Sequence, residues 1–398
     1  MKKVLVYFTQ FGSALGGGEF TPLAFISELQ KSCKVTLALN WRSDVSRAAE
    51  TLGIPLDMSL LDVVYVKPRN SLLRRLDAVF PVCRTWKLKK LAKKADLCIS
   101  TANMADFGRP AHHFVYLLRH FGDNAFCDRL AGRPALRGTA RLRRKLRTAL
   151  AEYFLRPLLG VRSSRKILAD PREKIYPTSH YVEKIMRDFY GDFNSTVFYP
   201  PTIWEPSLPA PARDPLKVVS LGQLFPEKRL MEIVALVERA RELSGLDLKL
   251  SLAGPLGATP YVGKLQAAAA EKSWLTLPGP MYGSEKERFL RSASYAVHAE
   301  RDEAFGISVT EYLKSGLVPV VPDEGGTCEI AGTPALCWHT VEEGAKILAR
   351  LASDAGFGKE QRQFCAERAE LFTRQVYEKN QHALLAGILD SIGEDRHP

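Results

Sequence analysis

Two glutamates, Glu303 and Glu311, stand eight residues apart in the C-terminal half of the chain. Between them lies AFGISVT, which carries no charge and one glycine, Gly306. This composition favours a loop that leads into a helix, with the backbone N–H groups of Phe305, Gly306 and Ile307 near a helix start that attracts negative charge. The spacing could aim the two carboxylates at different parts of one elongated, anionic ligand. For such a pair taken alone, two surface glutamates on a solvated helix are the plainer interpretation.

Two glycine-rich turns add to this chemistry. The first strand-like run, KKVLVYF, is followed by a loop that ends in GGGE, with Gly17 and Gly18 at the start of a helical pattern. Glycine N–H groups at a helix N-terminus suit a phosphate or a sugar hydroxyl. The second turn, EGGT, contains Gly326 and follows the apolar run LVPVVP. A glycine run is a weak signal, and a loop without a ligand explains the first turn equally well.

A basic turn lies in SLGQLFPEKRL, residues 220–230. A strand-like run ends near its glycine, and Lys228 and Arg229 follow at the start of the next helical pattern. Two cations at this place would neutralise a diphosphate and stabilise it as a leaving group. An exposed basic turn that binds nothing is the plainer interpretation of this stretch alone.

Length and composition indicate an α/β protein of two domains. A chain of 398 residues exceeds what one hydrophobic core usually holds. Strand-like runs alternate with helical patterns in both halves, which is typical of parallel, doubly wound sheets. A proline-rich, polar segment, residues 195–215, separates the two series. We therefore expect two Rossmann-like domains, 1–203 and 204–370, followed by a helical tail, 371–398.

The formal net charge of +12 indicates an anionic partner such as a phosphorylated substrate, a membrane surface or a nucleic acid. The stretch 133–165 is rich in arginine, and Glu152 is its single acid. Its leucines recur near helical spacing, so we expect a basic amphipathic helix that lies on an anionic membrane surface. A solvated helix with a leucine stripe facing the core stays open as an alternative. Nucleic acid is not expected, because aromatic residues are not interleaved with the basic ones.

No apolar run approaches the length of a membrane span, and the start MKKVLVYFT is too short and too strand-like for a signal peptide. We therefore expect a cytoplasmic protein, peripheral at most at the inner face of the membrane. The seven cysteines show no C-x-x-C spacing, which argues against a disulfide framework or a zinc site. A D-x-D in a suitable loop is also lacking, so we expect no obligatory metal and no cofactor.

In this order, the loops resemble those of the family 4 glycosyltransferases, which have the GT-B fold. The stretch EAFGISVTEYLKSGLVPVVPDEGGTCEI is similar to that family's E-x-F-G-x-x-x-x-E signature with the strand and glycine turn after it. SLGQLFPEKRL resembles the first strand, loop and helix of the family's donor domain, and GGGE resembles its N-terminal glycine loop. LLRHF and the glutamine of SLGQLFPEK are similar to one branch, the α-1,2-mannosyltransferase that elongates a lipid-linked oligosaccharide. The resemblance implies two Rossmann-like domains facing each other across a cleft, with the C-terminal helix packing back on the first.

The resemblance also implies a role for each matching residue of the donor site. Glu311 would bind the ribose hydroxyls of the nucleotide, and Glu303 would contact the transferred sugar. Lys228 would bind the diphosphate, helped by Arg229. The family commonly carries arginine where this chain has Gln223, so more of the diphosphate charge would rest on Lys228.

The remaining implied site residues are backbone donors and one histidine. Glu303, Lys228 and His120, the histidine of LLRHF near the sugar, make up the implied catalytic set. An ordinary half-buried histidine is the alternative for His120. The implied backbone contacts to the donor come from Phe305, Gly306, Ile307, Gly17, Gly18 and Gly326.

The function implied by the resemblance is transfer of a hexose, mannose or a similar sugar, from a nucleotide-diphospho-sugar such as GDP-mannose, with retention of the anomeric configuration. The acceptor would be a glycan or a lipid-linked molecule in cell-surface polysaccharide or glycolipid synthesis. Two alternatives use the same scaffold: a non-catalytic protein that binds nucleotide sugars, and an epimerase. Turnover of the bound donor, and the identity of its product, separate these three functions.

Overall fold

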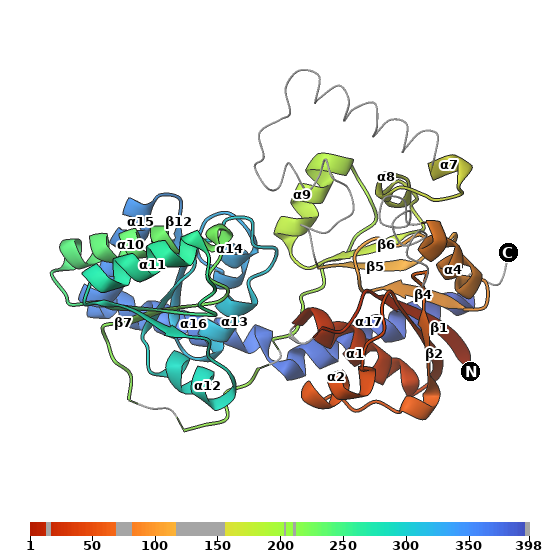
Figure 1. The fold of residues 1–398 in the computed structure, drawn as a ribbon, viewed down its shortest axis with the longest axis horizontal. Coiled ribbons are helices and arrows are strands. Elements are labelled where there is room, and N and C mark those ends of the chain that lie inside the picture. Colours follow the sequence, from red (N-terminus) through yellow and green to blue (C-terminus); the bar gives the residue numbers. More distant parts are fainter. Residues whose placement is uncertain (13–16, 69–81, 117–155, 203, 210–211, 395–398) are drawn as a thin grey trace, which may run out of the picture. The chain divides into compact units, whose positions relative to one another are not determined.

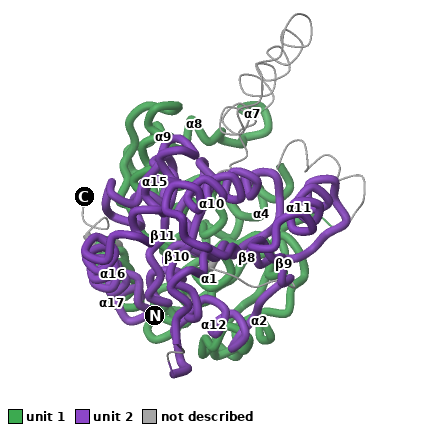
Figure 2. Tube along the Cα trace, turned by 90° about the vertical axis from the view of Figure 1, so that its left-hand side faces the viewer, with its two compact units in different colours: residues 1–203, 378–398 green, residues 204–377 purple. Residues whose placement is uncertain are grey.

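The computed structural model describes residues 1–12, 17–68, 82–116, 156–202, 204–209 and 212–394 (Figure 1). The chain divides into two compact units, Met1–Ile203 with Glu378–Pro398, and Trp204–Tyr377 (Figure 2). The division falls inside the proline-rich segment. His120 and most of the basic stretch 133–165 lie outside the described residues.

The first unit is built on a parallel six-stranded sheet with the strand order β3-β2-β1-β4-β5-β6. This order is that of a Rossmann fold, in which the chain reverses direction across the sheet between its first and fourth strands. The described elements of this unit are β1 (Lys2–Phe8), α1 (Gly17–Gln30), β2 (Cys33–Leu39), α2 (Val45–Thr51), β3 (Leu61–Tyr65), α4 (Val82–Ala92), β4 (Leu97–Ser100), β5 (His112–Val115), α7 (Arg156–Leu158), α8 (Ser164–Leu168), β6 (Lys174–Pro177) and α9 (His180–Tyr190).

Apolar side chains from the sheet and its helices form the core of the first unit. The rings of Phe25 in α1 and Phe114 in β5 meet edge to face, with centroids 4.7 Å apart. The last helix, α17 (Arg374–Glu394), joins the same unit from Glu378 onward. Gln381 on this helix donates a hydrogen bond of 2.9 Å to the carbonyl oxygen of Ala24. The chain end is therefore bonded directly to α1.

The second unit repeats the plan of the first. Its parallel strands follow the order β12-β11-β10-β7-β8-β9, which is the same topology counted from the other edge. The elements are β7 (Lys217–Leu221), α10 (Leu230–Ser244), β8 (Lys249–Ala253), α11 (Pro260–Glu271), β9 (Leu275–Gly279), α12 (Gly283–Arg291), β10 (Tyr295–Val297), α13 (Ile307–Lys314), β11 (Val318–Pro322), α14 (Gly326–Ala331), β12 (Cys337–Trp338), α15 (Val341–Ser353) and α16 (Ala355–Ala369).

Helices cover both faces of the second sheet, with α10 and α11 on one side and α12 and α13 on the other (Figure 1). Every residue of β11 is buried, which explains why its sequence VPVVP reads as an unbroken apolar run. Helix α15 starts with a capping box between Thr340 and Glu343 and packs against α10.

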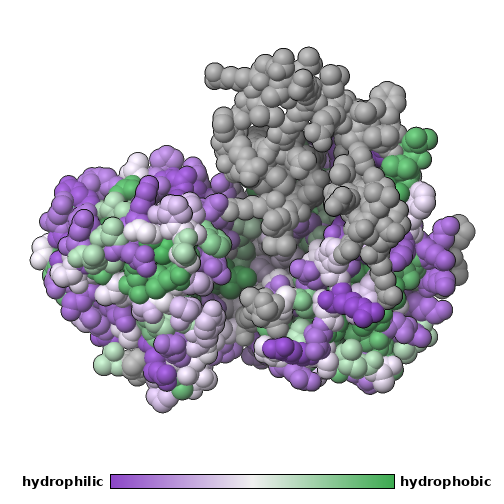
Figure 3. Space-filling view, viewed as in Figure 1, coloured by the Kyte–Doolittle hydropathy of each residue, from purple (hydrophilic) through white to green (hydrophobic). Residues whose placement is uncertain are grey.

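Hydrophilic side chains predominate on the visible face of each unit, with apolar residues scattered between them (Figure 3). Among the described helices, none is long and apolar enough to span a lipid bilayer.

Candidate active site

The candidate site lies where the second sheet reverses its strand order. Strands β7 and β10 are hydrogen-bonded neighbours, with Val219 opposite Ala296, although many residues separate them in the sequence. Ligands of open α/β sheets bind beyond the carboxyl ends of the strands at such a switch point. The loops that leave β7 and β10 here carry Lys228 and Glu303, so the topology of the sheet brings these two predicted residues together.

Lys228 ends a short 3-10 turn, Pro226–Lys228, directly before α10. Its ammonium donates a hydrogen bond of 2.7 Å to Oε2 of Glu303. Oε2 of Glu300 forms a second ion pair with the same nitrogen. The Lys228 side chain is 27% exposed and that of Glu300 is 8% exposed, so these charges are largely removed from solvent. One cation therefore bridges two carboxylates at the switch point.

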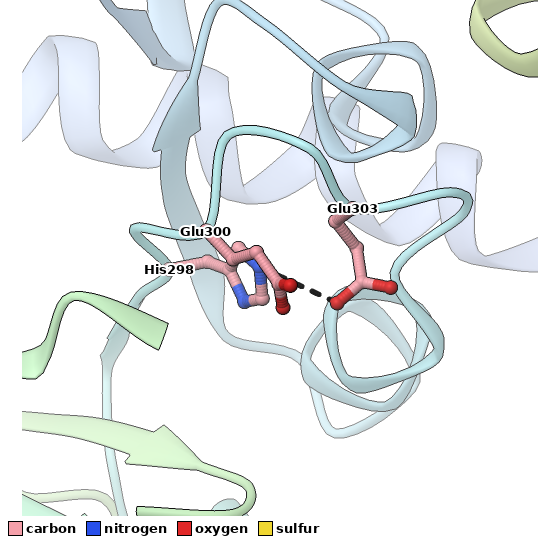
Figure 4. A group of neighbouring side chains, drawn as sticks. All are labelled: His298, Glu300 and Glu303. Atoms are coloured by element: carbon pink, nitrogen blue, oxygen red, sulfur yellow. Dashed lines mark ion pairs between the residues drawn. The ribbon is translucent and has the colours of Figure 1, made fainter. Parts of the chain in front are cut away.

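His298 completes this group of side chains (Figure 4). It directly follows β10, is 4% exposed, and points its Nε2 toward Oε2 of Glu303 at 3.9 Å. Among the residues that the structure describes, none offers a hydrogen-bond partner to this nitrogen. His298 also lines a small pocket together with Gly222, Gln223 and Lys228. A buried polar atom without a partner is costly, and a ligand in this pocket could supply the missing hydrogen bond.

The pKa values follow from burial and from the crowding of charges. Burial raises the pKa of Glu300 to about 7, and the neighbouring charge of Glu303 adds to the effect. Burial acts in the same direction on Glu303, but the charge of Lys228 outweighs it and lowers the pKa of Glu303 to about 2. Burial opposes the charge of Lys228, yet the two carboxylates raise its pKa above the usual value. Burial lowers the pKa of His298 to about 4, so this imidazole is neutral at physiological pH.

Within the described part of the chain, two groups of side chains have the composition of a metal site. His298, Glu300 and Glu303 offer ligand atoms within 4.8 Å of one another, and Asp323, Glu324 and His339 do so at exposed positions after β11 and β12. In the first group, the Lys228 ammonium already bonds both carboxylates. Acidic clusters as exposed as the second are common without an ion. A metal-free reaction therefore stays a prediction.

Gly306 shapes the loop that carries Glu303. Its φ is +100°, a conformation that glycine adopts readily, and it is the N-cap of α13 without a side-chain cap. The start of α13 therefore exposes its backbone dipole without competition from a capping side chain. Phe305 directly before it is buried, with its ring 6.2 Å from that of Phe372.

The backbone N–H of Gly326 bonds to the protein itself. It donates a hydrogen bond of 2.8 Å to the carbonyl oxygen of Glu303, so this donor is already used. A methyl group on Gly326 would lie 2.5 Å from the carbonyl oxygen of Ala304 and 2.8 Å from Cα of Phe305. Gly326 therefore lets the EGGT turn press against the Glu303 loop. Its contact with a donor stays a prediction.

Glu311 is 8% exposed on α13 and is paired inside the unit. Lys286 of α12 donates a hydrogen bond of 2.8 Å to Oε1 of Glu311, and the same ammonium lies 5.3 Å from the ring centre of Trp204. The next residue on α13, Tyr312, accepts a hydrogen bond of 2.8 Å from the backbone N–H of Leu221 through its hydroxyl. This bond ties α13 to the end of β7.

Three predicted donor-site residues lie apart from this group: Arg229 pairs with another residue, and Gly17 and Gly18 lie in the first unit. Arg229 has a φ of +50° and pairs with Glu232 at 2.9 Å, so its guanidinium is engaged. Gly17 and Gly18 begin α1 of the first unit, at the helix start expected from the sequence. Sequence reasoning missed His298 and Glu300. The one available signal was their place directly after a strand-like run.

The family model "Glycosyl transferases group 1" matches residues 207–370, which lie within the second unit. No curated protein sequence matches the chain. Among solved structures, HepE of Anabaena in complex with UDP and glucose aligns with a TM-score of 0.62 at 14% identity, covering 98% of this chain and 100% of that one. Sucrose-phosphate synthase of Thermosynechococcus elongatus aligns with a TM-score of 0.64 at 13% identity, covering 98% and 100%.

A third structure, WaaG, "a glycosyltransferase involved in lipopolysaccharide biosynthesis", aligns with a TM-score of 0.59 at 13% identity, covering 96% of this chain and 100% of that one. At such identities these structures establish the fold, and the family model matches most of the second unit. Residues 207–370 therefore match the model of the glycosyl transferases group 1 family, within a chain that has the GT-B fold.

Proposed function

We propose that this protein transfers a sugar from a nucleoside diphosphate sugar to an acceptor hydroxyl. The observation that carries the proposal is the Lys228–Glu303 pair at the switch point of a glycosyl transferases group 1 domain. The solved structure of HepE in complex with UDP-glucose, which has the same fold, contains such a donor. Lys228 would bind the diphosphate, Glu303 the sugar and Glu311 the ribose hydroxyls.

The reaction breaks the bond between the anomeric carbon of the sugar and the diphosphate oxygen. Lys228 and the start of α13 stabilise the charge that collects on the leaving diphosphate. The backbone N–H groups of Phe305, Gly306 and Ile307 donate hydrogen bonds to the donor's sugar hydroxyls and phosphate. The acceptor hydroxyl then attacks the oxocarbenium-like carbon from the face that the diphosphate leaves, which retains the anomeric configuration. Its proton passes to the departing phosphate oxygen.

We further propose a hexose such as mannose as the transferred sugar and a glycan or lipid-linked molecule as the acceptor, in surface polysaccharide or glycolipid synthesis. The resemblance at the sequence level supports this choice of branch. The basic stretch 133–165 would hold the protein on an anionic membrane surface at the cytoplasmic face. No obligatory metal is proposed, because the resemblance at the sequence level implies a metal-independent reaction.

The first test measures donor binding and turnover. The protein is melted with UDP-glucose, GDP-mannose and related donors, and bound donors are then followed by nucleoside diphosphate release and product NMR. We expect stabilisation by at least one donor and a product that keeps the donor's anomeric configuration. No stabilisation by any donor at millimolar concentration would refute the proposal. Binding without turnover would favour a non-catalytic nucleotide-sugar-binding protein, and a changed free sugar nucleotide would favour an epimerase.

Lys228→Ala and Glu311→Ala test the placement of the donor. A lost hydrogen bond to a charged group costs about 1.5–3 kcal/mol, which corresponds to roughly a tenfold to hundredfold weaker donor affinity. Arg239→Ala is the matched control, because it removes an exposed cation of the same unit that pairs with Glu342. Unchanged affinity in both site variants would contradict the placement.

A further inference from the structure

The cations around the switch point are balanced by carboxylates before any ligand enters. Arg229 and Arg301 both pair with Glu232, at 2.9 Å and 4.0 Å. Lys228 faces Glu300 and Glu303 at once. The proposed diphosphate site thus contains one cation, Lys228, that is paired with two carboxyl groups. A polyanion that approaches Lys228 meets no surplus of positive charge from these side chains.

Glu300 is the carboxylate that the proposed function leaves without a role. Glu303 has a place near the sugar, and its backbone carbonyl anchors Gly326. Glu300 is 6% exposed, three residues after the end of β10, and its Oε2 contacts the same nitrogen that would bind the diphosphate. A phosphate on Lys228 would therefore lie within a few ångströms of this carboxylate and would compete with it for the ammonium.

The competition is unequal for substrate and product. In a nucleoside diphosphate sugar, each phosphate is a diester with one negative charge. After transfer, the terminal phosphate of the nucleoside diphosphate is a monoester, which carries about −1.5 to −2 at pH 7. The carboxylate of Glu300, which is ionised above its raised pKa of about 7, therefore repels the product more strongly than the donor.

We propose that Glu300 is a specificity-determining residue that competes with the terminal phosphate for Lys228 and so favours the intact donor over the nucleoside diphosphate product. This inference rests on the proposed function, because it takes Lys228 as the diphosphate ligand. Glu300 acts through charge on a bound phosphate and is not a catalytic residue.

The test compares Glu300→Gln with the wild-type protein. Glutamine keeps the size of the side chain and removes the charge. At a pH above 7, where Glu300 is ionised, removing its charge at about 5 Å and an effective dielectric constant of about 20 changes phosphate affinity by at least about tenfold. We expect Glu300→Gln to bind UDP and GDP at least about tenfold more tightly by calorimetry. The affinity for UDP-glucose and GDP-mannose should rise less. The inhibition constant of the product should therefore fall relative to the KM of the donor.

Glu342→Gln is the control, since it removes a half-exposed carboxylate of the same unit that pairs with Arg239. It should leave both affinities unchanged. Glu300→Ser serves as a second variant if glutamine bonds to Lys228 in place of the carboxylate, and thermal melting shows that each variant is folded.

Three outcomes would overturn the inference. Folded Glu300→Gln and Glu300→Ser proteins that bind UDP and GDP no more tightly than the wild type would refute the competition. An equal gain for donor and product would refute the discrimination. Tightening of wild-type binding by Mg²⁺, abolished by EDTA and by Glu300→Gln, would instead assign the carboxylate to a cation. Absence of donor and product binding in every protein would refute the proposed function as well, which separates the two failures.

Discussion

Replacing Gly326 by alanine adds a single methyl group between two loops of the candidate site. Gly326 is not in the left-handed region, so its backbone conformation accepts alanine. The new methyl carbon would lie 2.5 Å from the carbonyl oxygen of Ala304 and 2.8 Å from Cα of Phe305. Both are backbone atoms, which cannot rotate away as the end of a flexible side chain can. The perturbation is therefore purely steric, and it acts on the backbone of the two residues that follow Glu303.

The size of the effect follows from these distances. Unstrained contacts between heavy atoms lie at about 3.5–4.0 Å, so the loops must separate by roughly 1 Å. Overpacking of this kind costs about 1–3 kcal/mol of stability. The hydrogen bond from Gly326 to the carbonyl of Glu303, 2.8 Å long, would lengthen as the loops part. A displacement of about 1 Å at a reacting group can lower turnover by roughly a hundredfold.

Urea unfolding and donor turnover measure the two consequences separately. Gly263→Ala is the matched control, because this glycine is exposed inside α11 and a methyl group there meets nothing within 4 Å. Alanine in a helix interior is favoured over glycine by about 0.5–1 kcal/mol, so the control should be slightly more stable than the wild type. A Gly326→Ala protein with wild-type stability and turnover would refute the reasoning, as would a Gly263→Ala protein that is equally destabilised.

Two further predictions concern ion pairs. Lys286→Met leaves the buried carboxylate of Glu311 without its cation, which should cost about 3–5 kcal/mol in urea unfolding, whereas Lys286→Arg should keep most of the stability. Unchanged stability in Lys286→Met would contradict this pairing. Burial acts to raise the pKa of Asp106, but its hydrogen bonds from Arg162 and Lys89 outweigh burial and lower it below 3.8. Its stabilising contribution is therefore complete above that value and is lost as the pH falls through the folded-state pKa. Arg162→Met should weaken this acid dependence, and an identical pH profile of unfolding would contradict the assignment.

The alternation of strands and helices was enough to predict both sheets. Runs such as KKVLVYF and LVPVVP are apolar and β-branched because parallel strands are buried on both faces, and the structure places both in sheets. Lys228 and Glu303 were also assigned to one site from the sequence, and they contact each other. Their proximity has a physical reason, since both residues follow strands that a doubly wound order places side by side at the switch point; their role in a donor site stays a prediction.

The individual partners of hydrogen bonds and ion pairs in the loops could not be predicted in this way. The pairing of Arg229 with Glu232, which accompanies its left-handed backbone conformation, was not predicted. The help that Arg229 gives Lys228 at the diphosphate stays a prediction. The hydrogen bond from the N–H of Gly326 to the carbonyl of Glu303 was also not predicted, and the contact of Gly326 with a donor stays a prediction. Local sequence specifies that these residues lie in turns. The partner of each group depends on which of several nearby carbonyls and carboxylates the folded loops bring closest.

The presence of Glu300 beside Lys228 bears on why the neutral residue Gln223 stands where the family commonly has an arginine. Burial alone would lower the pKa of Lys228 and favour loss of its charge, and the paired carboxylates reverse this tendency. Glu303 at 2.7 Å already supplies one such partner, so a second carboxylate exceeds what is needed to keep the lysine charged. Strong binding of a diphosphate would be served better by a cation at position 300 than by Glu300. It would likewise be served better by a cation at position 223 than by the neutral Gln223. The arrangement instead suits a site that holds a donor moderately and releases a more highly charged product quickly.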